Sequence, residues 1–245
     1  MFGFFHRKSK VRDLSWMMVD MHSHLLPGID DGMKSAVDSV SAIRALTDLG
    51  LQRFICSPHV FDEVYPNTPQ TIRGALDALQ TELDRQRVAV PVSASAEYML
   101  GEEFRDKMVR GELLPLPGNY LLVEMPYTTE PLQVEDLLFD IGVHGYRPIL
   151  AHPERYTFYY NSPERYVRLK DVGCLFQLNI LAPSGYYGEK CQQMALRLLR
   201  EGMYDIVGTD LHHERHLAAL TKYVRNGKAG DTLAGYPFQN SSLFC

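Results

Sequence analysis

The amino-acid sequence predicts an α/β fold built on parallel strands. Apolar, strand-like runs alternate with helix-like segments from Met17 to Val207, and this alternation is typical of parallel strands joined by right-handed crossovers. Seven strand-like runs are present, one fewer than in the usual α/β barrel. No Pro-, Gly- or Ser-rich linker interrupts the alternation, so we expect a single barrel domain over residues 17–245.

Each predicted strand ends beside a side chain that can bind a metal ion, a phosphate or a proton. The strands are residues 17–21 before His22 and His24, 54–56 before His59, 92–96 before Glu97, 121–123 before Glu124, 149–151 before His152, 175–178 before Asn179, and 206–208 before Asp210 and His212. The carboxyl ends of parallel strands converge in barrel enzymes. We therefore expect these side chains to surround one polar centre.

Helices are predicted where apolar residues recur at helical spacing. Such spacing occurs at residues 35–49, 69–87, 131–143, 163–172 and 189–199, and less clearly at 101–110. Glycines at 50, 145, 173 and 202 follow four of these segments and are typical helix stops.

Composition narrows the class of protein. Apolar residues make up 45% and charged residues 22% of the 245-residue chain, which is enough to fill a core. The net charge of −5 argues against nucleic acid as a partner. The four cysteines show no paired spacing, so we expect reduced thiols and a cytoplasmic location. No apolar run approaches the ~20 residues that span a bilayer.

The N-terminal residues differ from the rest. Phe2, Phe4 and Phe5 are followed by four cations, which is the reverse of the order in a signal peptide. We expect a loosely ordered basic and aromatic arm over residues 1–16. The alternative is a weak contact with a membrane surface or a partner.

The strongest local motif is the His22-Ser23-His24 pair. Residues i and i+2 of a strand face the same way, so both imidazoles can reach one ion, and Asp210-Leu211-His212 repeats this spacing. Asp31 lies in a Gly-rich turn, where ordinary turn chemistry would also explain it. Imidazole and carboxylate without thiolate suit manganese, iron and zinc alike.

Four motifs carry a resemblance to a known family. They are His22-Ser23-His24-Leu25-Leu26-Pro27-Gly28-Ile29-Asp30-Asp31-Gly32, Ser57-Pro58-His59, Ala151-His152-Pro153-Glu154-Arg155-Tyr156 and Gly208-Thr209-Asp210-Leu211-His212. With them the chain resembles the polymerase-and-histidinol-phosphatase (PHP) superfamily. Within it, the chain is similar to the bacterial manganese-dependent protein tyrosine phosphatases associated with capsular and exopolysaccharide synthesis.

The resemblance implies a distorted seven-stranded TIM-like barrel that holds three divalent ions, with manganese as the metal. It assigns the ligands as His22, His24, Glu97 and Asp210 for the first ion, His59, His152 and the bridging Glu97 for the second, and Asp31, Glu124 and His212 for the third. It implies hydrolysis of protein phosphotyrosine through a metal-bridging hydroxide. The implied substrate is the tyrosine-phosphorylated tail of a membrane-associated bacterial kinase of polysaccharide export.

Two arginines and three tyrosines are further candidates for the site. Arg155 and Arg215 each lie three residues past a predicted ligand, and a guanidinium matches a phosphoryl group bidentately, so both are candidate catalytic residues. Tyr156, Tyr186 and Tyr187 follow strand ends and could stack on a substrate ring.

Other functions remain open on the sequence alone. A small-molecule phosphatase of the histidinol phosphatase kind would share the metal set, and a non-catalytic metal-binding module is a weaker alternative. Amidohydrolases often carry a strand-end lysine, which is absent here, and deoxyribonucleases need a cationic surface. Cys191 and Arg197 have the spacing of a cysteine-based phosphatase, but helix-forming residues without glycine separate them.

Overall fold

The strands of the computed structural model, which describes residues 11–245, are all paired in parallel. They are β1 (Val19–Asp20), β2 (Arg53–Cys56), β3 (His59–Val60), β4 (Val92–Ala94), β5 (Glu97–Met99), β6 (Tyr120–Glu124), β7 (Arg147–Ala151), β8 (Leu175–Asn179) and β9 (Ile206–Gly208). The predicted α/β class with parallel strands is confirmed.

The strands form two sheets rather than the single closed barrel that the sequence predicted. One has the order β1-β2-β4 and the other the order β3-β5-β6-β7-β8-β9. The predicted strands 54–56 and 92–96 are each followed by a further short strand that the sequence did not predict. β3 follows β2 after Ser57-Pro58, and β5 follows β4 after Ser95-Ala96. Pro58 has no N–H to continue the ladder. The pairing of these strands nevertheless continues past the end of β2 and β4, because Ser95 N–H donates to Cys56 O at 2.8 Å.

The first and last strands lie side by side, although they are far apart in the sequence. Ser23 and Leu211 form an isolated parallel bridge just beyond β1 and β9. The buried Asp20 carboxylate accepts hydrogen bonds from Thr209 N at 3.0 Å and Thr209 Oγ1 at 2.6 Å. These contacts join the edges of the two sheets and bring His22 next to Asp210.

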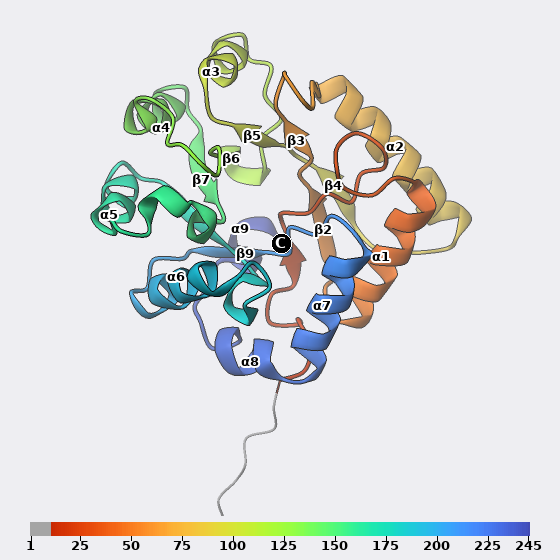
Figure 1. Cartoon of the computed structure of the whole chain (residues 1–245). Coiled ribbons are helices and arrows are strands. Elements are labelled where there is room, and N and C mark those ends of the chain that lie inside the picture. The colour runs from red at the N-terminus through yellow and green to blue at the C-terminus, as the bar shows by residue number, and fades with distance from the viewer. Residues whose placement is uncertain (1–10) are drawn as a thin grey trace, which may run out of the picture.

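Helices surround the strands (Figure 1). The predicted ones are α1 (Ala36–Asp48), α2 (Pro69–Arg85), α3 (Glu102–Val109), α4 (Val134–Val143), α5 (Glu164–Asp171) and α6 (Glu189–Arg200), all confirmed with small shifts at their ends. Three further helices were not predicted from the sequence, and they are α7 (Glu214–Arg225), α8 (Lys228–Leu233) and α9 (Asn240–Phe244). Local chemistry sets the helix starts: Thr68 and Thr71 form a reciprocal capping box at α2, with Pro69 in its first turn.

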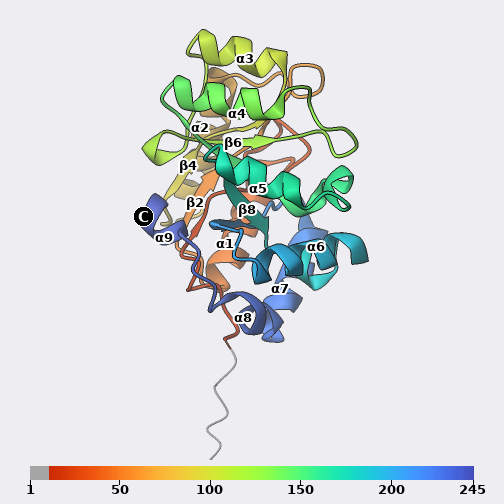
Figure 2. The same cartoon turned by 90° about the vertical axis from the view of Figure 1, so that its left-hand side faces the viewer.

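The short helix α9 covers one end of the strands. Phe244 belongs to a buried apolar cluster with strand residues such as Val19 and Ile206. Asn240 Nδ2 donates to Val19 O at 2.9 Å and to Val207 O at 2.7 Å, so α9 bridges β1 and β9. Figure 2 shows α9 and the C-terminus at the left edge of the molecule.

The predicted N-terminal arm lies partly outside the described residues, since only residues 11–16 of it are described. Leu14 is fully buried and its N–H donates to Leu49 O. The Trp16 ring stacks on Phe238 at 6.0 Å. Within residues 11–245, no helix combines the length and apolar character needed to cross a membrane.

Candidate metal centre

The histidines that follow β1 are oriented by hydrogen bonds on their outer ring nitrogens. His22 Nδ1 donates to Gln177 Oε1 at 2.7 Å, and His24 Nδ1 donates to Asp30 Oδ2 at 2.8 Å. Both Nε2 atoms then face inward and lie 3.3 Å apart. Ligand histidines in metal sites are typically held in this way, because the outer hydrogen bond fixes the ring and its tautomer.

Glu97, at the start of β5, lies among four imidazoles and is fully buried. Its Oε2 lies 3.3 Å from His22 Nε2 and 3.4 Å from His24 Nε2. The same oxygen lies 3.1 Å from His59 Nδ1, and Oε1 lies 3.1 Å from His152 Nε2. One carboxylate therefore contacts ligand candidates from several strands, which is the geometry of a bridging ligand.

Asp210 lies opposite Glu97, beyond the end of β9. Its Oδ1 is 3.3 Å from both His22 Nε2 and His24 Nε2. Asp210 and His152 have positive φ angles, 49° and 36°, which non-glycine residues adopt only at an energetic cost. The surrounding structure compensates for this strain. Asp210 N–H, for example, donates to His22 O at 2.8 Å.

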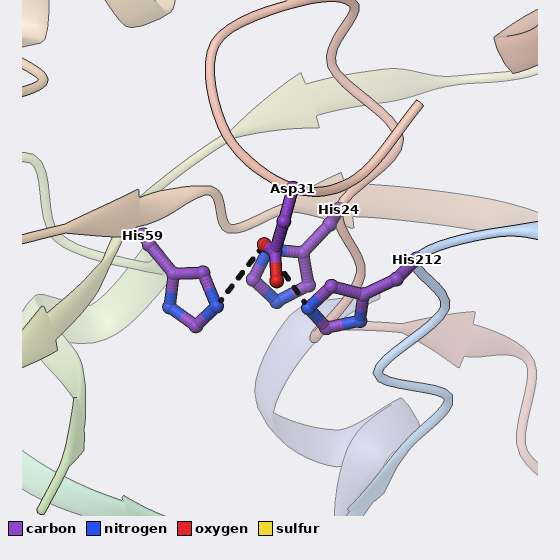
Figure 3. A group of neighbouring side chains, drawn as sticks. All are labelled: His24, Asp31, His59 and His212. Atoms are coloured by element: carbon purple, nitrogen blue, oxygen red, sulfur yellow. Dashed lines mark ion pairs between the residues drawn. The ribbon is translucent and has the colours of Figure 1, made fainter. Parts of the chain in front are cut away.

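The more exposed side of the centre is formed by residues from three different segments (Figure 3). Asp31 Oδ1 lies 3.6 Å from His59 Nε2 and 3.6 Å from His212 Nε2, and the Asp31 side chain is 51% exposed. His212 Nδ1 donates to the Asp210 carbonyl at 2.9 Å, so its Nε2 faces Asp31. Glu124 Oε1 lies 2.9 Å from His59 Nδ1.

All of the metal ligands expected from the sequence come together, in four overlapping groups. In each group the ligand atoms lie within 4.8 Å of one another; the groups are His22, His24 and Asp210; His22, Glu97 and His152; His59, Glu97 and Glu124; and His24, Asp31, His59 and His212. The grouping differs from the expected one in several respects. Glu124 lies with Glu97 and His59, and His152 lies with His22 and Glu97. Asp31 and His212 lie with His24 and His59.

Several buried polar atoms of the centre have no partner in hydrogen-bonding geometry, although two of them lie within ion-pair distance of an imidazole or a carboxylate. They include Glu97 Oε2, His59 Nδ1 and His152 Nδ1. Buried polar atoms without partners are costly, and a metal ion is one way to satisfy them. The buried thiol of Cys56 has its pKa raised to about 12 by burial and contributes no ligand to any of the four groups. The residues present therefore fit hard or borderline divalent ions.

The pKa values reflect this crowding of charge. Burial and the neighbouring His24 oppose protonation of His59, but Glu97 and Glu124 dominate and raise its pKa to about 10. His212 differs, since burial and His24 lower its pKa to about 4. Burial opposes ionisation of Glu97, yet the surrounding histidines hold its pKa well below the usual range.

Arg155 lies directly beside the ligand cluster. Its Nη1 donates to Asp210 Oδ2 at 2.9 Å. Its Cζ lies 4.5 Å from the centre of the Tyr127 ring and 4.6 Å from that of Tyr187, so the guanidinium is held between two aromatic faces. Burial alone would lower the Arg155 pKa, but the Asp210 carboxylate raises it and keeps the guanidinium charged.

The other candidates for substrate contact are placed differently. Tyr187 lines the cavity at the centre, whereas Tyr186 packs edge-on against Tyr187 and His216 and is 39% exposed. Tyr156 is fully buried; its hydroxyl donates to Ala151 O and accepts from Met125 N. Tyr156 therefore supports the site from behind instead of lining its mouth. Arg215 is an exposed residue of α7 and is absent from the cavity lining.

The centre opens into a cavity of about 390 Å³. Aromatic and apolar side chains supply much of its wall, and they are Phe61, Val64, Tyr65, Met99, Tyr127 and Tyr187. Sequence reasoning missed Tyr127, although it lies only three residues beyond Glu124 and so carries the same strand-end signal. It also missed the roles of Asp30 and Gln177, which depend on contacts that no local spacing reveals.

Cys191 has none of the features of a nucleophile. It is buried inside α6, and burial raises its pKa. Arg197, six residues on, pairs with Glu201 at 2.8 Å. The cysteine-phosphatase reading of this segment therefore finds no support.

Known proteins match almost the whole chain. The family described as "Capsular polysaccharide synthesis, CpsB/CapC" matches residues 18–228. Tyrosine-protein phosphatase YwqE of Bacillus subtilis is 30% identical over 92% of this chain and 91% of its own length. Tyrosine-protein phosphatase CpsB of Streptococcus pneumoniae is 27% identical over 80% of this chain and 83% of its own.

A solved structure of this family also matches almost the whole chain. It comes from work on YwqE of Bacillus subtilis and CpsB of Streptococcus pneumoniae, described as unique metal-dependent tyrosine phosphatases. It aligns with a TM-score of 0.77 at 27% identity, over 93% of this chain and 96% of its own. The resemblance inferred from the four motifs is confirmed, and the chain belongs to the CpsB/CapC family of capsular polysaccharide synthesis.

Proposed function

We propose that this protein is a metal-dependent phosphatase that hydrolyses phosphotyrosine in proteins and thereby regulates capsular or exopolysaccharide synthesis. The observation that carries the proposal is the position of Arg155, held beside a cluster of imidazole and carboxylate ligands at the base of an aromatic-lined cavity. YwqE of Bacillus subtilis and CpsB of Streptococcus pneumoniae are named as tyrosine phosphatases, which supports this function. Neither name supports the histidinol phosphatase or the non-catalytic alternative.

The residues of the chain have separable tasks in this reaction. His22, Glu97 and Asp210 would hold divalent ions through inward-facing atoms. Bound divalent ions lower the pKa of water and neutralise phosphoryl charge. Arg155 would donate to the equatorial oxygens of the phosphoryl group, since its planar fork matches them and only Nη1 is engaged with Asp210.

The cavity wall favours an aryl phosphate. Tyr65, Tyr127 and Phe61 give the cavity an aromatic lining that a substrate ring would cover, whereas a phosphoserine side chain would leave that surface uncovered. The phenol of phosphotyrosine also has a pKa near 10, so it departs more easily than an alkyl alcohol and needs less help from a general acid.

We further propose that three divalent ions, most simply manganese, are shared among the four ligand groups.

We also propose that the nine short strands form a distorted seven-stranded barrel. β2 with β3 and β4 with β5 would each count as one strand of this barrel, because each pair is nearly continuous. Free thiols at Cys56, Cys174 and Cys191 support a cytoplasmic location. The proposed substrate is the phosphorylated tail of a polysaccharide-export tyrosine kinase.

A substrate comparison tests the proposed function. The chelated and dialysed protein is assayed with and without added manganese on a phosphotyrosine peptide, the matching phosphoserine peptide and histidinol phosphate. We expect manganese-dependent turnover with a clear preference for the phosphotyrosine peptide. Faster turnover of histidinol phosphate would favour the small-molecule alternative, and no turnover of any substrate would favour the non-catalytic one.

A further inference from the structure

A buried asparagine at the end of β8 contacts two of the three groups that surround Arg155. Asn179 Nδ2 donates to Asp210 Oδ2 at 2.8 Å and to the Tyr187 hydroxyl at 3.0 Å. Asp210 Oδ2 is the oxygen that also accepts from Arg155, and the Tyr187 ring is one of the two faces that enclose the guanidinium. One side chain therefore fixes both an ionic and an aromatic neighbour of Arg155.

The orientation of this amide follows from its partners. Asn179 Oδ1 accepts from Leu181 N–H at 3.0 Å, and a backbone N–H can only donate. Nδ2 must therefore face Asp210, whose carboxylate can only accept. Both amide hydrogens and the carbonyl oxygen are used, so the side chain has one arrangement. An aspartate in this place would set a second carboxylate against Asp210.

The backbone of Asn179 is itself anchored from behind. Its N–H donates to Glu154 Oε1 at 2.9 Å, and Glu154 Oε2 accepts from the Tyr204 hydroxyl at 2.9 Å. Glu154 and Asn179 are fully buried, and Asn179 is absent from the cavity lining. Any effect of Asn179 on substrate must therefore pass through another residue.

The two oxygens of Asp210 have different partners as a result. Oδ1 faces the ring nitrogens of His22 and His24, while Oδ2 takes Asn179 and Arg155. Without Asn179, Oδ2 would keep Arg155 as its remaining side-chain partner among residues 11–245. Arg155 would then be held by an oxygen that has lost its second partner and by a Tyr187 ring whose hydroxyl is no longer anchored. The guanidinium could therefore turn while Oδ1 stays with His22 and His24.

We propose that Asn179 is a positioning residue that aims Arg155 at the phosphoryl group by holding Asp210 Oδ2 and the Tyr187 hydroxyl. The inference rests on the proposed phosphatase function. It assigns to Asn179 an effect on phosphoryl binding and not on metal retention, because Asp210 Oδ1 and the histidines are left in place.

A double-mutant cycle tests the proposal on the manganese-loaded full chain. The inhibition constant of inorganic phosphate and the KM and kcat for a phosphotyrosine peptide are measured for wild type, Asn179→Ala, Arg155→Lys and the double variant. We expect Asn179→Ala to weaken phosphate binding about tenfold, as for loss of a hydrogen bond to a charged group. In the Arg155→Lys background, the same change should have less than about a twofold further effect.

A matched control separates positioning from general stability. Asn240 is also a buried asparagine, but it bonds only to the backbone of Val19 and Val207. Asn240→Ala should lower the melting temperature while leaving phosphate inhibition unchanged. Tyr187→Phe removes only the hydroxyl that Asn179 holds, and it should weaken phosphate binding about threefold. This variant should keep the fold, so it tests the proposal even where Asn179→Ala fails to fold.

Several results would overturn the proposal. One is a tenfold loss of phosphate binding from Asn179→Ala that persists in the Arg155→Lys background. A second is a loss of bound manganese in Asn179→Ala that accounts for the weaker phosphate binding. A third is an equal loss of phosphate binding in Asn240→Ala. Failure of the wild-type protein to bind phosphate or to hydrolyse the peptide would instead overturn the proposed function itself.

Discussion

At the scale of single residues, the surroundings of Arg155 require the planar shape of a guanidinium as well as its positive charge. The planar guanidinium lies between two tyrosine rings, with its Cζ 4.5 Å and 4.6 Å from the ring centres and one nitrogen on Asp210. A lysine would keep the positive charge, but its ammonium is a compact point charge on a flexible stem. It cannot make two parallel hydrogen bonds to a phosphoryl group or stack between the rings.

We therefore expect Arg155→Lys to lower kcat/KM for a phosphotyrosine peptide roughly 100-fold, the usual loss when a preorganised donor is removed. Bound manganese, measured by elemental analysis, should be unchanged. Arg197→Lys is the matched control, since Arg197 is an exposed residue of α6 whose partner is Glu201. Normal kinetics in the Arg155→Lys variant would contradict a phosphoryl-binding role for this residue.

The thiols give an independent residue-scale prediction. Burial raises the pKa of Cys56 and of Cys174 to about 12 and also raises that of Cys191, so these thiols stay protonated near pH 8. Only Cys245 is exposed. Brief alkylation of the native protein at pH 8 should modify Cys245 and leave phosphatase activity intact. Mass spectrometry of the treated protein identifies the modified cysteine.

The activity of Cys191→Ser should likewise stay within about twofold of wild type, because a buried, protonated thiol cannot act as the nucleophile. An excess of chelator should abolish the activity of both proteins, and added manganese should restore it. Activity that resists the chelator but is lost in Cys191→Ser would overturn the metal-dependent mechanism.

At the scale of elements, the loop between β1 and α1 couples tight packing to ligand placement. A Cβ added at Gly32 would lie 2.2 Å from His24 O and 2.5 Å from His24 Cβ, so only glycine fits there. Gly32 N–H also donates to Asp30 Oδ1, while Asp30 Oδ2 orients His24. Displacement of this turn would therefore move both the orienting carboxylate and Asp31.

We expect Gly32→Ala to reduce manganese affinity roughly 10–100-fold, as for other losses of the groups that orient ligands. The free energy of unfolding of the metal-free protein should fall by only about 1–3 kcal/mol. Calorimetric titration and denaturant unfolding measure the two quantities. Gly74→Ala in α2, where a Cβ meets nothing within 4 Å, is the control and should not weaken metal binding. Wild-type metal affinity in Gly32→Ala would show that the turn does not set the ligand geometry.

Sequence reasoning succeeded for elements whose pattern is local. The spacing of Val40, Ile43 and Leu46 predicts α1, and a glycine follows that helix as a stop. It failed for α9, which is only five residues long and is defined by its contacts with β1 and β9. The short strands β3 and β5 were also missed, because each is only two or three residues long and is defined by its pairing with a distant strand.

The candidate site shows the same limit. The convergence of the candidate ligands could be predicted, because all of them except Asp31 lie at or just beyond the end of a predicted strand, and parallel strands bring their carboxyl ends together. The side-chain directions could not. Tyr156 points into the core and Arg215 lies outside the cavity, although both stand at suitable distances from ligands in the sequence. Packing against distant segments decides which way such side chains face.

At the scale of the whole molecule, the centre joins the first strand of the structure to the last. His22 follows the first strand and Asp210 the last, and the hydrogen bond from Asp210 N to His22 O connects them. The ions proposed for this place would therefore bind residues from both sheets at once. Since the unfolded chain cannot assemble such a site, metal binding should stabilise the entire fold.

Protons and metal ions compete for this centre. In the metal-free protein, nearby carboxylates raise the pKa of His22, of His24 and of His59, the last to about 10. Ionic contacts of these imidazoles with Glu97 and its neighbours then stabilise the metal-free fold. Because the folded pKa of His59 lies above the usual value near 6.5, its contribution is complete below pH 6.5 and is lost as the pH rises through about 10.

A metal ion requires the neutral imidazole, so binding must displace these protons. We expect manganese binding near pH 8 to release protons, and the affinity to increase with pH up to about 10. Calorimetric titrations in two buffers with different ionisation enthalpies would measure the release. The melting temperature of the metal-free protein should fall over the same pH range, so the gap to the metal-loaded protein should widen. Equal binding enthalpies in the two buffers would show that no protons are displaced, and hence that these imidazoles are already neutral before the metal binds.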